Sequence, residues 1–121
     1  LPAIERLVQN MTGRIGKKQT LLFSALTRKD SQQMLARLQE ALPNVNIILT
    51  SFHPSRGLSI ARSDVEAYLD SPKVTYEESF EEVIDRFASS TDDESELWVT
   101  GSLYFIAEVR HWWKNRKPKE E

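Results

Sequence analysis

The feature that most constrains the fold is a set of short, continuous apolar runs that alternate with longer segments of helical period. Residues 19–26 read QTLLFSAL, and residues 45–50 read VNIILT. Such runs are typical of strands buried on both faces of a parallel sheet. Between them, residues 31–42 carry apolar side chains at helical spacing, and this alternation indicates a βαβ unit. The sequence therefore predicts an α/β fold, with a mostly parallel sheet and helices on both faces.

The remaining segments fit the same plan. An apolar stripe of helical period runs through the first 12 residues, and because no methionine precedes it, we expect this chain to be cut from a longer protein. Residues 74–76 predict a short edge strand, and residues 97–100 predict the last strand. Further helices are predicted at residues 63–69, 80–88 and 103–114.

Three helix starts are predicted from capping boxes, in which Ser, Thr or Asp stands three positions before Glu or Gln. The pairs are Asp30 with Gln33, Ser63 with Glu66, and Thr75 with Glu78. We expect each pair to open the helix that follows it.

Size and charge exclude several classes of protein. The 121 residues suit one domain, and 16 basic against 18 acidic residues give a net charge of −2, so we expect no nucleic-acid partner. The chain has no cysteine, which excludes disulfides and zinc–thiolate sites and suits a reducing compartment. No apolar run approaches the length of a membrane span. We expect a monomeric, cytoplasmic domain that contacts no membrane.

Common catalytic and nucleotide-binding motifs are also missing. The four glycines, at positions 13, 16, 57 and 101, supply neither a P-loop nor a Rossmann fingerprint. A receiver-type phosphorylation domain would need acidic residues where Leu26 and Phe52 stand. A Ser-His-acid triad could use Ser102 and His53, but no G-x-S-x-G elbow presents the serine. No metal site is predicted.

Position along the strands nominates the functional loops. In open α/β sheets, ligands bind beyond the carboxyl ends of the strands, here residues 27–30, 51–59 and 100–102. The last of these is Thr100-Gly101-Ser102, where a strand turns tightly into a helix. Glycine permits a close approach, and helix N–H groups with a serine hydroxyl favour an anion. Ser102 could equally be a simple N-cap, and the residues alone leave both interpretations open.

Three segments carry a resemblance to one enzyme family. Residues 99–110 read VTGSLYFIAEVR, residues 23–30 read FSALTRKD, and residues 49–56 read LTSFHPSR. In chain order from residue 23 they resemble motifs of bacterial folylpolyglutamate synthase / dihydrofolate synthase enzymes. The third segment departs from the family pattern, in which Arg follows Pro directly, because Ser55 stands between Pro54 and Arg56. The resemblance covers nearly the whole chain and implies a Rossmann-like C-terminal domain of the Mur ligase type.

The resemblance implies an ATP-dependent ligation of glutamate to dihydropteroate or to the γ-carboxylate of a folate. In this family, ATP and Mg²⁺ are held by a larger N-terminal ATPase domain whose D-G-A-H-N motif lies just before the helix that begins here near Pro2. We therefore expect the chain alone to be inactive and to hold no catalytic residue. Its partners would be its own ATPase domain, glutamate and the folate or dihydropteroate substrate.

The same resemblance places a group of residues at the cleft between the two domains. There the chain would close over ATP and glutamate and keep water from the acyl phosphate. The expected cleft residues are Thr100, Gly101, Ser102, Ser51, His53 and Arg56. The alternative is an independent α/β binding or regulatory module without catalysis.

Overall fold

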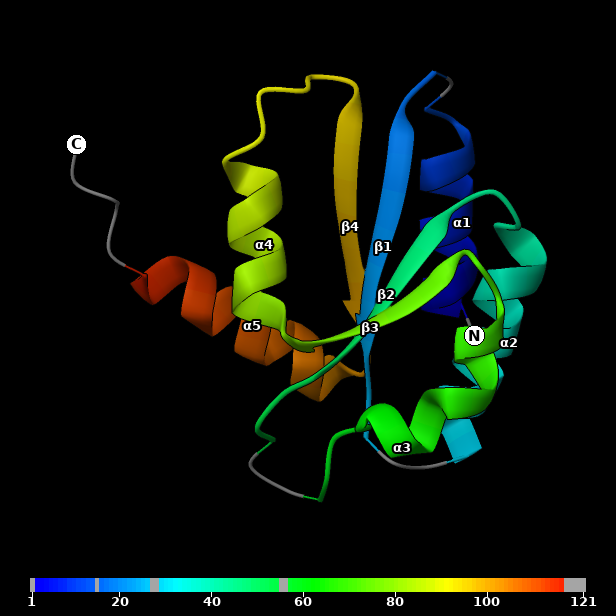
Figure 1. Cartoon of the computed structure of the whole chain (residues 1–121), viewed down its shortest axis with the longest axis vertical. Coiled ribbons are helices and arrows are strands. Elements are labelled where there is room, and N and C mark those ends of the chain that lie inside the picture. The colour runs from blue at the N-terminus through cyan, green and yellow to red at the C-terminus, as the bar shows by residue number, and fades with distance from the viewer. Residues whose placement is uncertain (1, 15, 27–28, 55–56, 117–121) are drawn as a thin grey trace.

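A parallel sheet forms the centre of the computed structural model, which describes residues 2–14, 16–26, 29–54 and 57–116. Its four strands lie in the order β3-β2-β1-β4, and every pairing is parallel (Figure 1). The strands are β1 (Lys18–Ser24), β2 (Asn46–Ser51), β3 (Val74–Ser79) and β4 (Ser95–Gly101). The predicted α/β class and parallel sheet are therefore confirmed.

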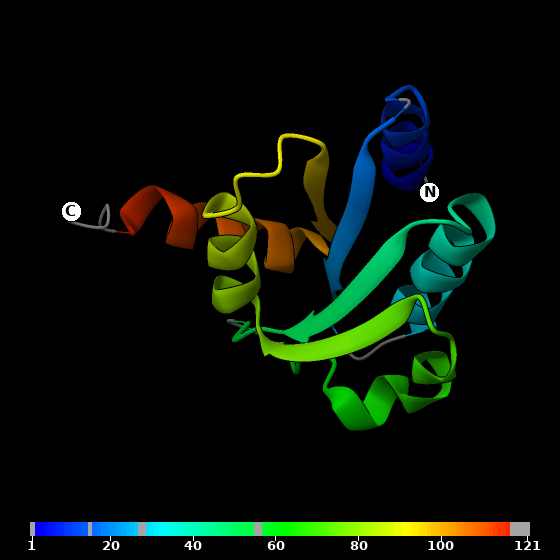
Figure 2. The ribbon, with the colours of Figure 1, turned by 45° about the horizontal axis from the view of Figure 1, so that its top comes forward.

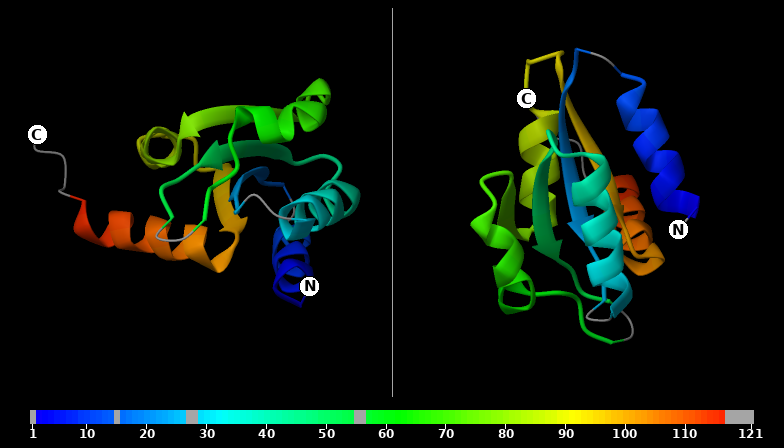
Figure 3. Two further views of the ribbon diagram at one scale, coloured as in Figure 1. Left: turned by 90° about the horizontal axis from the view of Figure 1, so that it is seen from below. Right: turned by 90° about the vertical axis from the view of Figure 1, so that its right-hand side faces the viewer.

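Helices cover both faces of this sheet, as predicted. The first face carries α1 (Pro2–Thr12), α2 (Lys29–Ala41), the short α3 (Arg62–Val65) and the 3-10 helix η1 (Glu66–Asp70). The second carries α4 (Phe80–Ala88) and α5 (Leu103–Asn115). Figure 2 shows the sheet between these two groups, and Figure 3 shows α5 leaving it directly from the end of β4.

The core lies in two apolar layers, one on each face, with β1 at the centre of both. Leu21 and Phe23 project into the layer under α1 and α2, whereas Leu22 projects into the layer under α4 and α5. All three side chains are fully buried. Each such burial contributes about 1.5–3 kcal/mol, which explains why residues 19–26 read as one continuous apolar run.

None of the three predicted capping boxes opens its helix: strand pairing takes the residues of one, and the helix begins earlier in the other two. Thr75 belongs to β3, where it lies opposite Ile48 of β2, so it does not begin α4. The N-cap of α4 is Ser79, whose Oγ accepts a hydrogen bond of 3.2 Å from the Glu82 N–H. Because β3 continues to Ser79, the edge strand was placed correctly but predicted three residues too short.

The other two helix starts also differ from the prediction. Helix α3 begins at Arg62 after Ala61, whose N–H donates to the Asp64 carboxylate at 2.8 Å, so Ser63 is not its N-cap. Helix α2 already includes Lys29, so Asp30 lies inside the helix and does not cap it. In both cases the helix gains an earlier residue than the local side-chain pattern indicated.

The strand order fixes where a ligand site is expected. From β1 the chain proceeds outward through β2 to β3, whereas β4 returns to the opposite side of β1. The topological switch point of the sheet therefore lies between the carboxyl ends of β1 and β4, where ligands of open α/β folds bind.

Candidate functional site

Gly101 brings the end of β4 against the end of β1. Its φ is +140°, and it lies opposite Ser24 in the β1–β4 register. A Cβ at this position would lie 3.0 Å from the carbonyl carbon of Ser24 and would overlap its oxygen. The following N–H, of Ser102, donates to that same oxygen at 3.1 Å. Only glycine allows this approach, which places the start of α5 beside β1.

Ser102 is the N-cap of α5. Its Oγ accepts a hydrogen bond of 3.3 Å from the Phe105 N–H, and its carbonyl oxygen accepts one of 3.1 Å from the Ile106 N–H. The capping interpretation is thus confirmed. A hydroxyl that accepts a bond still has its own proton to donate, and the first N–H groups of a helix have no acceptor within that helix. Anion binding at Ser102 stays a prediction.

Thr100, unlike Ser102, lies within strand β4 and is buried. It is 8% exposed and lies opposite Phe23 within the sheet, so its position is that of a buried strand residue. Ser102, the third residue of the predicted turn, lines a cavity.

That cavity, the switch-point cavity, has a volume of about 190 Å³ and lies between the end of β1 and the beginnings of α2 and α5. Its lining is Ala25, Leu26, Ser31, Met34, Ser102, Leu103 and Tyr104. None of these side chains carries a charge. The polar groups at the cavity are the hydroxyls of Ser31, Ser102 and Tyr104 and the amino end of α5, which is the positive end of its dipole.

The rim of the switch-point cavity leaves apolar side chains in solvent. Leu103 is 83% exposed and Tyr104 is 45% exposed. Leu58, in the loop after β2, is also exposed, although it does not line this cavity. Exposed apolar residues gathered around a cavity indicate a surface that another molecule or domain covers.

Ser51 and His53 lie in a second cavity, the β2–β3 cavity, of about 230 Å³. It shares no lining residue with the switch-point cavity, and Glu78 and Glu81 line it together with Ser79. The Ser51 hydroxyl donates to the Glu78 carbonyl oxygen at 3.1 Å, and the His53 N–H donates to the Glu108 carboxylate at 3.2 Å. Carboxylates on this side disfavour a substrate carboxylate. Ser51 and His53 therefore line a different cavity from Ser102, although the His53 N–H bonds to Glu108 of α5.

Arg56, the remaining predicted cleft residue, lies outside the described residues. The sequence did not point to Leu26, Met34 or Tyr104 as lining residues, because apolar side chains at helical or strand spacing indicate a core. Their place in the chain was the one sequence signal for this lining. Residues 27–30 were predicted as a loop beyond the carboxyl end of a strand, and they connect β1 to the α2 residues that line the cavity.

Ser24 adds one unusual feature at this edge. Its Oγ is fully buried and has no hydrogen-bond partner within the described residues. Strand alternation places this side chain on the same face as Leu22 and Leu26, which belong to the apolar layer of Phe105. A buried hydroxyl without a partner costs about 1–3 kcal/mol, so it marks a strained position at the switch point.

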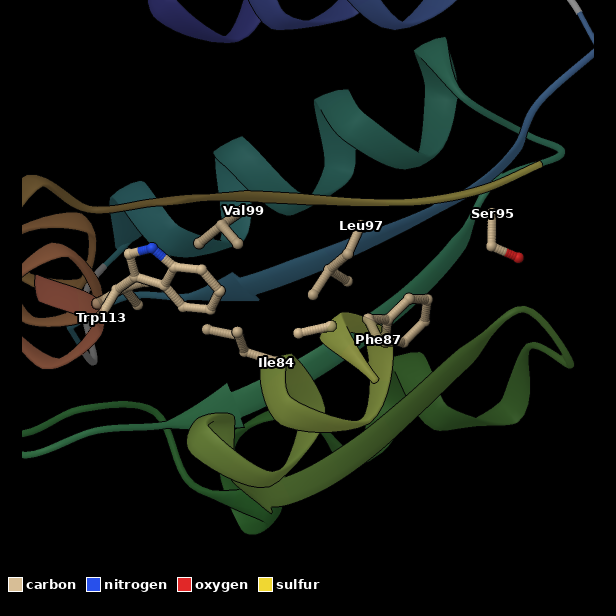
Figure 4. Close-up of a pocket in the computed structure, with 8 residues that line it drawn as sticks. Ile84, Phe87, Ser95, Leu97, Val99 and Trp113 are labelled. Carbon is tan, nitrogen blue, oxygen red and sulfur yellow. The ribbon is translucent and has the colours of Figure 1, made fainter. Parts of the chain in front are cut away.

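Another cavity, of about 330 Å³, lies away from the predicted loops. It runs along β4 from Ser95 to Val99 and is closed by Ile84 and Phe87 of α4 and by Trp113 of α5 (Figure 4). Ser95 is the single polar residue of its lining. Nothing there provides the convergent polar groups that orient a ligand.

The described ranges contain no group of three His, Asp or Glu residues that could hold a metal ion. In the same part of the chain, no helix is long and apolar enough to cross a membrane. No protein-family model, no curated protein and no solved structure matches this chain.

Proposed function

We propose that this chain is the Rossmann-like C-terminal domain of an ATP-dependent amide-forming ligase of the Mur ligase type, which adds glutamate to folates or dihydropteroate. The support from sequence is the order of three motifs between residues 23 and 110. The support from structure is that the most specific of these motifs forms the start of α5, at the switch point of a parallel sheet.

The observation that carries the proposal is the Gly101–Ser102 turn. It places a serine hydroxyl and the first N–H groups of a 13-residue helix at the mouth of a cavity. A ligase that joins an amine to an activated carboxylate must hold carboxylate groups without protonating the amine, which attacks only as the neutral free base. Fixed N–H and hydroxyl donors do this, because they bind an anion through hydrogen bonds and are too weakly acidic to give a proton to the amine.

This chain would contribute binding and closure to the reaction. Its described residues do not fit Mg²⁺, since they include no set of metal ligands, and the sequence has no P-loop for the triphosphate. Both groups therefore belong to the ATPase domain in this proposal. The exposed Leu103, Tyr104 and Leu58 would pack against that domain and exclude water from the acyl phosphate.

Ser102 offers a test that separates ligand binding from capping. Asp and Asn both cap helices as well as Ser does, so Ser102→Asp and Ser102→Asn keep α5 intact. In the full-length enzyme, Ser102→Asp sets a negative charge against the substrate carboxylate, and we expect KM for its carboxylate substrate to rise at least tenfold, which corresponds to about 1.4 kcal/mol.

Ser102→Asn is the matched control, because it is neutral and still has hydrogen-bond donors. It should keep KM within about threefold of the parent value, a difference below about 0.7 kcal/mol. Equal steady-state constants for both variants and the parent would return Ser102 to a purely structural cap. The chain would then fit an independent binding module better than a ligase domain.

A further inference from the structure

Strand β4 forms an edge of the sheet that is open to a further strand. It pairs with β1 on one side, and no described strand pairs with its other side (Figure 1). Open edges pair readily with other chains, and charged side chains commonly protect them. The opposite edge strand, β3, carries Glu77 and Glu78, and Glu77 forms an ion pair with Arg86. Residues 97–100 of β4 read LWVT and carry no charge, so this edge lacks such protection.

The backbone groups of Leu97 and Val99 point to this open edge. In the pairing with β1, the Glu94 carbonyl oxygen accepts a hydrogen bond of 2.8 Å from the Lys18 N–H. Because backbone groups alternate in direction along a strand, the even-numbered residues of β4 face β1 and the odd-numbered residues face away from it. The N–H and C=O groups of Leu97 and Val99 can therefore pair with a further strand.

An apolar groove, the β4 groove, follows the same edge on the face of α4 and α5. It is the cavity of about 330 Å³ in Figure 4, and its lining includes Leu97, Val99 and Trp113. Leu97 and Val99 are only partly buried, and Trp113 is 47% exposed. A strand that pairs with β4 would bring its own apolar side chains to this groove. The backbone and the side chains of β4 thus favour the same occupant, an apolar strand.

The sequence of β4 is complementary to itself. In an antiparallel pair about a two-fold axis, Leu97 of one copy can lie opposite Val99 of the other, which places Trp98 opposite Trp98. Leu97 and Val99 of both copies then form one apolar layer, and the two Trp98 side chains form a cross-strand aromatic pair on the face of α1. In this register Glu96 lies opposite Thr100, so no two carboxylates face each other.

The distribution of charge around β4 also favours a second copy in this orientation. Acidic residues 92–94 directly precede β4, and α5, which follows it, exposes Arg110 and Lys114. An antiparallel pair brings the beginning of one β4 to the end of the other. The acidic segment of each copy then lies beside the basic helix of the other, and the two-fold axis repeats this attraction. A parallel pair would instead bring the two acidic segments together.

We infer that two copies of this chain associate through the open edges of their β4 strands, as an antiparallel pair that continues the sheet from one copy into the other. The β4 grooves of the two copies meet at this contact, on the same face of the continued sheet. The inference does not depend on the proposed function, and it departs from the monomer expected from the sequence.

Sedimentation equilibrium of the 121-residue chain tests the inference. We expect a reversible dimer with a dissociation constant below about 100 µM. Leu97→Lys puts a charge into the apolar edge and should raise this constant by about tenfold or more. Thr75→Lys is the matched control, because Thr75 is exposed on β3, the other edge strand, and it should change the constant by less than about threefold. Circular dichroism verifies that both variants fold.

Two charge-reversed variants test the orientation and leave the apolar edge intact. One combines Arg110→Glu with Lys114→Glu, and the other combines Asp93→Lys with Glu94→Lys. Each variant alone brings like charges together, so its dimer should weaken by about tenfold or more. In an equal mixture the acidic helix of one variant meets the basic segment of the other, at both symmetry-related contacts. The mixture should therefore form a heterodimer within about threefold of the parent affinity.

Three results would overturn the inference. The first is a chain that stays monomeric at about 1 mM, a concentration at which even weak specific pairs associate. The second is a dimer that Leu97→Lys leaves unchanged, which would place the contact elsewhere on the surface. The third is a mixture of the charge-reversed variants that forms no heterodimer, which would refute the antiparallel orientation. The ligase proposal is tested separately by KM at Ser102.

Discussion

Replacing Gly101 by alanine tests whether the close approach of β4 to β1 builds the start of α5. The φ of +140° is strained for alanine, at a cost of about 1–3 kcal/mol. The added Cβ would also overlap the Ser24 carbonyl oxygen, which belongs to the backbone and cannot rotate away. Relief of this overlap breaks the Ser102–Ser24 hydrogen bond of 3.1 Å, worth about 1 kcal/mol. We expect Gly101→Ala to lower the free energy of unfolding by at least about 3 kcal/mol.

Gly16→Ala is the matched control for this prediction. Gly16 also has a positive φ, +88°, but no atom lies within 4 Å of the Cβ that would be added. Gly16→Ala should therefore lower the free energy of unfolding only through conformational strain, by about 1–2 kcal/mol. Urea unfolding monitored by tryptophan fluorescence measures the loss of stability in both variants. With a slope of about 1–3 kcal/mol per molar urea, Gly101→Ala should move the midpoint by about 1 M or more. Equal losses for the two variants would refute the role assigned to the contact with Ser24.

Two further predictions concern α4 and the strand before it. Ser79→Ala removes the N-cap of α4, so it should lower the free energy of unfolding in urea by about 1 kcal/mol. Thr75→Ala, at an exposed β3 position, should lower it by less than about 0.5 kcal/mol. A larger loss for Thr75→Ala than for Ser79→Ala would support the capping box of Thr75 and Glu78. Hydrogen bonds from Arg86, at 2.6 and 3.0 Å, lower the pKa of Glu77 below its ordinary 4.5, so this pair stabilises the fold above that pH and its contribution is lost as the pH falls through the lowered value. Because the pair is partly exposed, Glu77→Gln should cost under about 1 kcal/mol at pH 7 and progressively less as the pH falls through the lowered pKa of Glu77, and a cost that does not change with pH would contradict the ionic origin.

The parallel sheet could be predicted because its evidence is local and strong. The runs at residues 19–26 and 45–50 are apolar at nearly every position, as a strand with helices on both sides requires. The start of α4 could not be predicted in this way. Thr75 and Glu78 satisfy the capping pattern, but backbone pairing of β3 with β2 competes for the same residues and prevails. The pairing of β3 with β2 therefore sets the start of α4, and this long-range contact cannot be predicted from the residues around Thr75.

The candidate site, like the fold, could be predicted only where the evidence is local in the sequence. Gly101 and Ser102 could be nominated because a glycine and a capping residue at a strand end have few other uses. That His53 and Ser102 line different cavities could not be foreseen, since it depends on strand order: β2 and β4 lie on opposite sides of β1. Likewise, Leu103 and Met34 have ordinary apolar places in their helices, and only the packed structure shows that they line a cavity.

The most direct measurement of the central claim is ATP-dependent amide formation. Release of ADP and of the glutamylated product would be followed with glutamate and dihydropteroate or a folate, for this chain alone and for the chain joined to the ATPase domain that the proposal requires. We predict product and ADP in equal amounts from the joined form, none from the chain alone, and loss of the product when either glutamate or the acceptor is omitted. A joined form that folds, binds ATP and forms no amide would contradict the claim.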